Sequence, residues 1–468
     1  MDEYYIAIPT SLNLEQRLSK FPPNFAFNKD YCSYFIAELI RESFKKNTNE
    51  NTDINAIINH FIPRSSVLMQ KLYRGSKRHL DYLYENFPGE GPMLHRTNYK
   101  VGQSYSYRLP KYYWGDGQMK IITISENTLV KKIQKNTKAT IHNPVRKKID
   151  FLRGYFNSKL FELDHQSALI DLYADYKSTG NYKKYLSNVL KVVDFKNGYF
   201  PFYHRLNTDG RLHTAITTFP KICRKHLKYD NEGLAEVDIS ASIPFFLSYL
   251  LDLTVNSASF SLSTTKPGQY KINNPDIRTL YMLVKSSVFL STKEVAVFKE
   301  LVINDKIYDH FMLRFLNTPG FETDYENRNG KPFDGDTVDL KRYSKGKLLS
   351  MLFAKNSQYQ QEQAIFSEEF PTIHKFVKAF KSMKIKGVKT THVHKRLSYL
   401  LFQLESYFML KIIAREINIK HKRKIPIFTL HDCIVARESD IEKVHQEVHA
   451  IFTREIGYAP NLKVSYWI

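Results

Sequence analysis

The sequence has very little cysteine and no long apolar run. Its 468 residues include only three cysteines, Cys32, Cys223 and Cys433, too few and too scattered for a disulfide framework or a paired-cysteine zinc site. No stretch approaches the roughly 18 apolar residues of a membrane-spanning helix, and the first residues lack the basic and apolar regions of a secretion signal. No repeat is visible. We therefore expect a soluble, cytoplasmic protein without disulfides or membrane contact.

Acidic residues are also in short supply. Asp and Glu number 47 against 69 Lys and Arg, which gives a formal net charge of +22. Such an excess attracts polyanions and favours a nucleic acid as the partner. The same excess also aids solubility or follows from a Lys-rich genome, so charge by itself leaves both interpretations open. The chain is long enough for two or three structural units, and its size permits an enzyme.

Local patterns predict a mixture of helices, strands and loops. Residues 30–46 read as a helix, and the alternating aromatic pattern of residues 100–114 predicts a strand. A polar, Gly-rich segment at 317–336 predicts a loop between two helical stretches. A long apolar segment at 395–417 predicts a helix. Residues that could carry chemistry become dense only after about residue 200, and we place a domain boundary there.

Two aspartates stand in apolar, strand-like surroundings. Asp238 ends the approach "AEV", and Asp432 follows "IPIFTL" and His431 and precedes "CIVA". Adjacent strands would bring both carboxylates to one place, where they are ionised together only beside a counter-charge. Oxygen ligands favour Mg²⁺ or Mn²⁺, and two such ions about 3.5 to 4 Å apart are typical of nucleotidyl transfer. In isolation, each aspartate also fits an ordinary strand end and His431 fits a core histidine.

Four side chains recur at every fourth position of a predicted helix: Lys341, Lys345, Leu349 and Phe353. At about 100° per residue, they lie within a stripe of about 120°. Two cations followed by two apolar groups suit a nucleoside triphosphate lying along the helix. An amphipathic helix with lysines at the edge of its core face gives the same pattern, so the stripe alone supports both interpretations.

A basic cluster lies upstream of the first aspartate. Arg211 follows the turn residue Gly210 in "TDGRLHT", and Lys221, Arg224 and Lys225 follow in "FPKICRKHL". Basic side chains between apolar anchors suit contacts with a phosphate backbone. A solvated basic helix face has the same composition.

The order of these motifs resembles that of family A DNA polymerases and the related phage-type single-subunit RNA polymerases. The chain has, in order, TDGRL at 208–212, D-x-S from Asp238, the basic helix with Lys345, FPTIHKF at 370–376, and HD at 431–432. In those families a T-G-R-L element contacts primer and template, D-x-S and H-D each supply a metal-binding aspartate, and a helix of the pattern R-x3-K-x3-F-x3-Y-G binds the nucleotide. The matching motifs span a little under half of the chain.

The resemblance implies a role for each matching residue. The metal ligands would be Asp238, Asp432 and the backbone carbonyl of Ile239, and Lys345 would act in catalysis with both aspartates. The nucleotide would contact Lys341, Arg342, Lys345, Leu349 and Phe353, with Arg342 able to supply the guanidinium of the family where this chain has Lys341. The primer and template would contact Arg211, Arg224, Gln403 and His431. The implied cofactors are two Mg²⁺ ions, or Mn²⁺, and the implied partners are a DNA primer and template, or a template with RNA product, and nucleoside triphosphates.

The same resemblance implies a helix-rich α+β fold shaped as a right hand. Both aspartates would lie in an antiparallel palm sheet within a polymerase core at 201–468. Helical fingers would cover about 275–390, and residues 1–200 would supply a thumb-like domain that contacts nucleic acid. No spaced acidic motif of a proofreading exonuclease is recognisable in the N-terminal part. We expect a monomer that is similar to phage or mobile-element replication enzymes.

Three positions depart from the family pattern. Ile243 stands where the DNA polymerases carry a glutamate that excludes a 2′-hydroxyl, Phe353 replaces the tyrosine usual in the RNA polymerases, and Cys433 replaces a glutamate after the second aspartate. Asp432 lies 194 residues after Asp238 (432 minus 238), a spacing that favours the compact DNA polymerases. A DNA-dependent DNA polymerase without proofreading is therefore the first hypothesis, and a single-subunit RNA polymerase or primase-like enzyme is the second. A catalytically inactive nucleic-acid-binding replication protein is the third.

Overall fold

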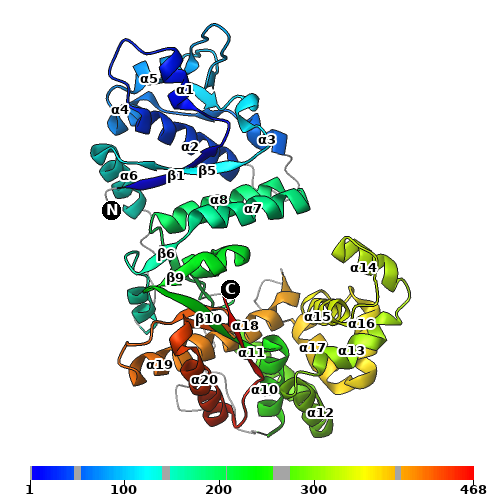
Figure 1. The fold of residues 1–468 in the computed structure, drawn as a ribbon. Coiled ribbons are helices and arrows are strands. Elements are labelled where there is room, and N and C mark those ends of the chain that lie inside the picture. Colours follow the sequence, from blue (N-terminus) through cyan, green and yellow to red (C-terminus); the bar gives the residue numbers. More distant parts are fainter. Residues whose placement is uncertain (1–2, 47–53, 140–147, 207, 257–274, 385–391) are drawn as a thin grey trace.

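The protein is a helix-rich α+β structure in which all described strand pairs are antiparallel. The computed structural model describes residues 3–46, 54–139, 148–206, 208–256, 275–384 and 392–468. Three parts are visible in Figure 1: an N-terminal lobe at the top, a central sheet with its helices below it, and a lobe of helices to the right. The α+β class and the antiparallel sheet predicted from the sequence are confirmed.

The N-terminal lobe is built around the strand pair β1 and β5 and the helix α2. Residues of α2 such as Tyr31, Phe35 and Ile36 are buried at helical spacing, which fixes the inner face of this helix. The elements of this part are β1 (Tyr4–Pro9), α1 (Leu14–Lys20), α2 (Lys29–Lys46), α3 (Ile54–Ile58), β2 (Ile62–Pro63), α4 (Ser66–Leu72), α5 (Ser76–Tyr84), β3 (His95–Arg96), β4 (Ser106–Arg108), β5 (Met119–Ile124), α6 (Asn127–Ala139), α7 (His165–Thr179) and α8 (Tyr182–Lys196). Helices α7 and α8 form the side of this lobe that faces the sheet (Figure 1).

The central sheet has six strands in the order β11-β12-β10-β9-β6, with β13 also paired to β10. Its strands are β6 (Phe161–Leu163), β9 (Leu227–Tyr229), β10 (Glu232–Ile239), β11 (Phe428–Leu430), β12 (Cys433–Arg437) and β13 (Leu462–Tyr466). A separate hairpin is formed by β7 (Phe202–His204) and β8 (Leu212–Thr214). Because β6 belongs to this sheet, the sheet takes one strand from before residue 200.

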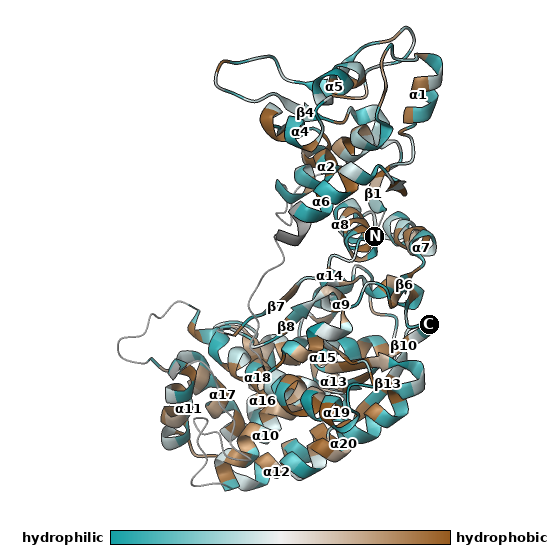
Figure 2. Ribbon diagram, turned by 90° about the vertical axis from the view of Figure 1, so that its left-hand side faces the viewer, coloured by the Kyte–Doolittle hydropathy of each residue, from teal (hydrophilic) through white to brown (hydrophobic). Residues whose placement is uncertain are grey.

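Helices pack on the sheet and bury their apolar residues against it. They are α9 (Ala215–Thr218), α10 (Ser242–Asn256), α18 (Arg396–Ser406), α19 (Ala414–Lys420) and α20 (Ile441–Ile456), with a π-helical segment at Tyr407–Ile413 that joins α18 to α19. All residues of α10 from Ser242 to Leu251 are buried, as in a helix inside a core. Hydrophilic residues lie mainly on the outer sides of the surrounding helices (Figure 2). The helical run Val393–Lys420 is long and apolar enough to cross a membrane, but 72% of its most apolar window is buried inside the protein.

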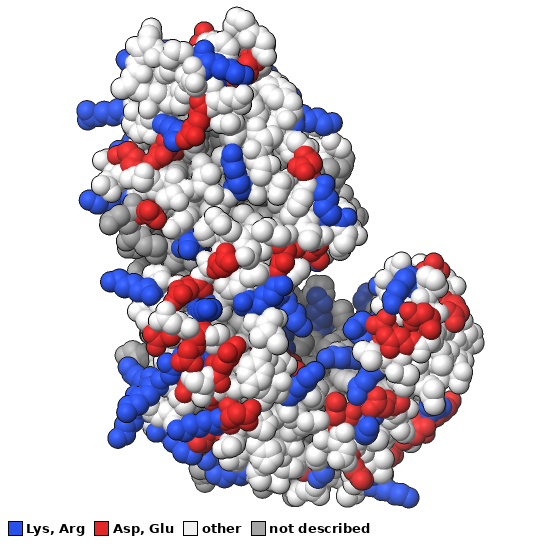
Figure 3. Space-filling model, in the orientation of Figure 1, with Lys and Arg blue, Asp and Glu red and all other residues white. Residues whose placement is uncertain are grey.

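The helical lobe contains α11 (Pro275–Ser287), α12 (Thr292–Ile303), α13 (Ile307–Leu316), α14 (Phe321–Asn329), α15 (Thr337–Phe353), α16 (Gln360–Glu369) and α17 (Pro371–Ser382). Stacked and edge-to-face aromatic rings, including Phe298, Phe311, Phe366 and Phe370, form its interior. A hollow with Lys and Arg side chains at its rim separates this lobe from the rest of the protein in the view of Figure 3.

Two predicted local elements differ from the structure. The segment 317–336 contains helix α14 instead of a continuous loop, because Phe321 and Tyr325 lie four residues apart and are both buried against Tyr343. The segment 100–114 contains only the short strand β4, followed by a 3₁₀ turn at Lys111–Trp114. Pro110, which lacks a backbone N–H, separates the two.

Candidate functional site

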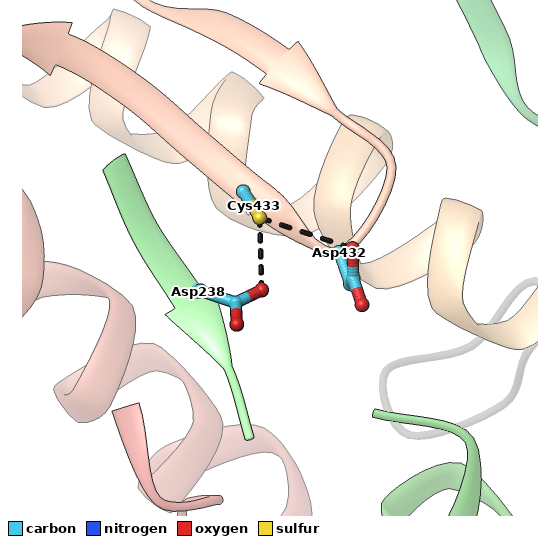
Figure 4. A group of neighbouring side chains, drawn as sticks. All are labelled: Asp238, Asp432 and Cys433. Carbon is cyan, nitrogen blue, oxygen red and sulfur yellow. Dashed lines mark hydrogen bonds between the residues drawn. The ribbon is translucent and has the colours of Figure 1, made fainter. Parts of the chain in front are cut away.

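The sheet brings the two predicted aspartates together. Asp238, near the end of β10, lies directly opposite Cys433, the first residue of β12, and Asp432 immediately precedes Cys433. Ligand atoms of the three side chains lie within 4.8 Å of one another (Figure 4). The Cys433 thiol donates a hydrogen bond of 2.8 Å to Asp238. The two strands therefore place both carboxylates at one spot, from positions far apart in the sequence.

A tight turn fixes the second aspartate. Leu430 pairs with Cys433, so His431 and Asp432 form a two-residue hairpin loop between β11 and β12. His431 has a φ of 59°, the left-handed conformation that such turns require at their first central residue. The N–H of Ile239 donates to the carbonyl of Asp432 at 3.3 Å, which ties the turn to the end of β10. Backbone geometry therefore sets the direction of the Asp432 carboxylate.

Electrostatics at this spot favour a bound cation. Burial, followed by the negative charges of Glu405 and Asp238, raises the pKa of Asp432 to about 7. Burial and the two aspartates also raise the pKa of the Cys433 thiol, which therefore stays protonated and acts as a hydrogen-bond donor. The carboxylate oxygens are the hard ligands that Mg²⁺ and Mn²⁺ prefer, so Asp238 and Asp432 fit such ions. Ile239, at the end of β10, is next to Asp238.

Three of the predicted primer and template residues gather beside the aspartates. Gln403 donates to the carbonyl of Thr208 at 2.7 Å, and Gly210, at a φ of 69°, packs so closely on α18 that a Cβ atom there would lie 3.3 Å from Gln403. The segment that carries Arg211 is therefore held against α18. His431 adjoins Asp432 in the hairpin turn, and the positive charge of Arg211 acts on its imidazole.

The imidazole of His431 is kept neutral. Burial, followed by the positive charge of Arg211 and by His213, lowers its pKa to about 4. Its ring meets His213 edge to face at 5.5 Å, and His213 stacks on Tyr203 at 4.9 Å. A neutral imidazole can donate one hydrogen bond and accept another, which suits contact with a sugar hydroxyl or a phosphate oxygen.

The fourth residue of that group, Arg224, lies elsewhere on the sheet. Its guanidinium pairs with Glu236 at 3.2 Å and covers the ring of Trp467 at 5.1 Å. The structure therefore does not bring Arg224 together with Arg211 and His431.

The predicted stripe of α15 faces two different neighbours. Lys341 pairs with Asp305 at 3.6 Å and with Asp309 at 3.2 Å, at the start of α13. Lys345 is exposed and forms no ion pair with any described residue. The half-buried Phe353 packs on Phe402 of α18 at 5.5 Å. The basic end of the stripe thus lies near α13, and its apolar end lies near α18, the helix that also carries Gln403.

The other two predicted nucleotide contacts, Arg342 and Leu349, lie on the same helix. Arg342 is exposed and pairs with Asp339 one turn away on the same helix. Leu349 is half-buried between Lys345 and Phe353. An ion pair within the helix leaves Arg342 at the surface, so Lys345 is the stripe's unpaired cation among the described residues.

Comparisons with known proteins show similarity at the level of structure alone. No protein-family model matches the chain, and no curated protein matches it by sequence. The solved structure of the POL domain of Pol1 from M. smegmatis, in complex with DNA primer-template and dNTP, overlaps with a TM-score of 0.35 and 10% identity. The overlap covers 72% of this chain and 66% of that chain. Similarity at this level supports no assignment of function, so a proposed function has to rest on the geometry of the site.

Glu405 is a site residue that the sequence patterns did not single out. It is fully buried on α18, where one carboxylate oxygen accepts two hydrogen bonds from Arg211, at 2.6 and 2.9 Å, and the other accepts one from Ser242 at 2.8 Å. Burial raises the pKa of Glu405, and the charge of Arg211 opposes that shift. The guanidinium of Arg211 also lies over Phe402 at 4.0 Å. This network fixes Arg211 beside the aspartates. The feature of the sequence that could have indicated Glu405 is an isolated glutamate in an apolar helix.

Tyr308 is a second such residue. It is 3% exposed, and its ring lies 5.8 Å from the amine of Lys345. Ser344 donates to its carbonyl at 2.9 Å and so ties α13 to α15. Burial, followed by the charges of Asp305 and Asp432, raises the pKa of its phenol. The phenol therefore lies within electrostatic reach of the aspartates, on the side where Lys345 is found.

Proposed function

We propose that this chain is a template-directed nucleotidyltransferase, and specifically a DNA-dependent DNA polymerase of the family A type. The observation that carries the proposal is the convergence of Asp238 and Asp432 from β10 and β12 to within 4.8 Å. Paired carboxylates at this distance suit two divalent cations, the usual arrangement for in-line nucleotidyl transfer. In this proposal the six-stranded sheet is the palm, the lobe α11–α17 is the fingers and the N-terminal lobe is the thumb.

The residues around the site can each perform one task of that reaction. Asp238 and Asp432 would hold two Mg²⁺ ions, which when bound lower the pKa of a 3′-hydroxyl and balance charge on the pyrophosphate. Lys345 would contact the triphosphate from α15, as the unpaired cation of its stripe. His431, neutral and next to Asp432, would hydrogen-bond the primer end. Arg211 and Gln403 would contact the primer and template from the segment held on α18.

One observation favours a second candidate, an RNA polymerase. Ile243 is the second residue of α10, is 8% exposed and carries no charge. The acidic group that would exclude a 2′-hydroxyl is therefore missing at this position. The preceding residue, Ser242, donates to Glu405, whose carboxylate is also bonded to Arg211.

Primer extension in Mg²⁺ tests the proposal. The wild-type protein should extend a primed DNA template with dNTPs, and synthesis only from rNTPs without a primer would favour the RNA polymerase. Asp238→Asn and Asp432→Asn should each reduce the rate at least about 100-fold, because each removes a cation ligand. Affinity for primer and template should be nearly unchanged in both variants.

A matched control is Glu442→Gln, which removes an exposed carboxylate from α20 and should leave the rate unchanged. Full activity of Asp238→Asn would exclude the two-cation site. Absence of synthesis by the wild-type protein with either kind of nucleotide, with nucleic-acid binding retained, would indicate an inactive binding protein instead.

A further inference from the structure

A basic and aromatic pocket opens on the sheet beyond the aspartates. It has a volume of about 390 Å³. Its wall includes Lys221, Arg224, Lys225, Glu236, Tyr466 and Trp467. The lysines come from the 3₁₀ helix Lys221–His226, the glutamate from β10 and Tyr466 from β13. Three separate chain segments thus meet around one pocket.

The floor of the pocket is held by a closed set of contacts. Glu236 accepts a hydrogen bond from the indole of Trp467 at 2.9 Å and pairs with Arg224 at 3.2 Å. The guanidinium of Arg224 in turn covers the Trp467 ring. The one acidic side chain of the wall is therefore neutralised within the protein, and Arg224 orients the aromatic ring instead of reaching outward.

The rim of the pocket carries lysines that have few partners within the described structure. Lys221 is exposed, and its amine has no ion pair or hydrogen bond with any residue that the structure describes. Lys225 is exposed and has a single partner, Asp171, at 2.9 Å. Tyr466 also borders the pocket, but it pairs with Ala235, so its side chain points to the opposite face of the sheet from Glu236. Exposed lysines with few partners inside the protein suit contacts with a phosphodiester backbone.

The strand register gives the distance from the aspartates. Asp238 pairs with Lys463 and Glu236 with Ser465, so Asp238 and Glu236 lie on the same face of the sheet, about 7 Å apart along β10. The N–H of Trp467 donates to the carbonyl of Leu234, which is about 13 Å from Asp238 along the strand. With about 3.4 Å per nucleotide, the pocket spans positions roughly two to four nucleotides away from the aspartates.

We propose that this pocket binds the backbone phosphates of the nascent strand, two to four nucleotides behind its 3′ end. The proposal rests on the proposed function, which places that 3′ end at Asp238 and Asp432. Lys221 and Lys225 make the phosphate contacts. This surface would hold the primer in line with the aspartates independently of its sequence.

Salt-dependent binding of a primer and template, measured with a chelator present so that no synthesis occurs, tests the proposal. Each lost phosphate contact should lower the slope of log affinity against log salt by about one. Lys221→Ala should therefore lower it by about one and the double variant Lys221→Ala/Lys225→Ala by about two. Lys221 has no partner to lose in the described structure, so its variant also controls for folding. Lys443→Ala, on the exposed side of α20, should leave the slope unchanged.

Primers with neutral methylphosphonate linkages locate the contact. Linkages two to four nucleotides from the 3′ end should weaken binding by the wild-type protein and have little effect on the double variant. Equal sensitivity of both proteins, or an unchanged slope in Lys221→Ala, would overturn the proposal. If binding follows the expected pattern but synthesis is absent, the pocket assignment stands and the polymerase proposal fails.

Discussion

Replacing Asp432 by Asn should stabilise the cation-free protein at alkaline pH. Burial and the charges of Glu405 and Asp238 raise the pKa of Asp432 from 3.8 to about 7. The folded protein therefore holds this proton more tightly than the unfolded chain does, and it loses stability as the pH rises from about 4 to about 7. Three pKa units correspond to about 4 kcal/mol, which is an upper limit because solvent reaches part of the carboxyl group.

Urea denaturation in the presence of a chelator measures this effect. At about pH 8, Asp432→Asn should exceed the wild type in free energy of unfolding by up to about 4 kcal/mol, and the gain should vanish near pH 4, where both states bind the proton. Saturating Mg²⁺ should stabilise the wild type and not the variant, which narrows the difference between them. Glu442→Gln should show no pH-dependent gain. A variant less stable than the wild type at pH 8, or a gain independent of pH, would refute the reasoning.

Three further substitutions test the packing around the site. Glu405→Gln should lower the free energy of unfolding by about 3 kcal/mol, because it breaks a buried ion pair with Arg211; a loss below about 1 kcal/mol in urea denaturation would contradict this. Ala241→Val should cost at least about 1 kcal/mol in the same assay, since Ala241 has a left-handed φ of 54°, and an unchanged midpoint would speak against strain at this turn. Burial lowers the pKa of Lys381 to about 8, so its charged form destabilises the folded state below that pH. Although Lys381→Met loses the hydrogen bond to the carbonyl of Met351, it should gain more stability at about pH 7 than at about pH 10.5. An equal change in the free energy of unfolding at both pH values would contradict this.

The sequence predicted local character well where a periodic pattern was long. Helix α2 and the long helical run around α18 agree with the segments 30–46 and 395–417. The prediction for 317–336 was wrong because polar composition hid the pair Phe321 and Tyr325, whose burial depends on a residue of another helix. Local sequence patterns predict a short polar helix of this kind poorly, because the contacts that stabilise it are tertiary.

The site depended on contacts over long sequence distances. Apolar surroundings marked Asp238 and Asp432, but only strand pairing between β10 and β12 sets their register. Glu405 and its partner Arg211 are 194 residues apart, so no local pattern relates them. The pairing of Lys341 with the acidic start of α13 was equally invisible in the periodicity of α15. Spacing can propose a charged stripe, and only the folded neighbours show which of its charges is unpaired.

Strand β10 pairs with β12 and β13, two strands that the ribosome synthesises long after it. Asp238 meets Cys433 across 195 residues, and the pairing of Ala235 with Tyr466 comes later still. At about 5 to 20 residues per second, translation of that interval takes about 10 to 40 s. During this time the backbone N–H and C=O groups of β10 that later bond to β12 and β13 stay unpaired. The strand can therefore pair with another chain instead. A ribosome-bound chain would therefore have no cation site until β12 emerges, and it would depend on early burial of α10 to protect the waiting strand from aggregation.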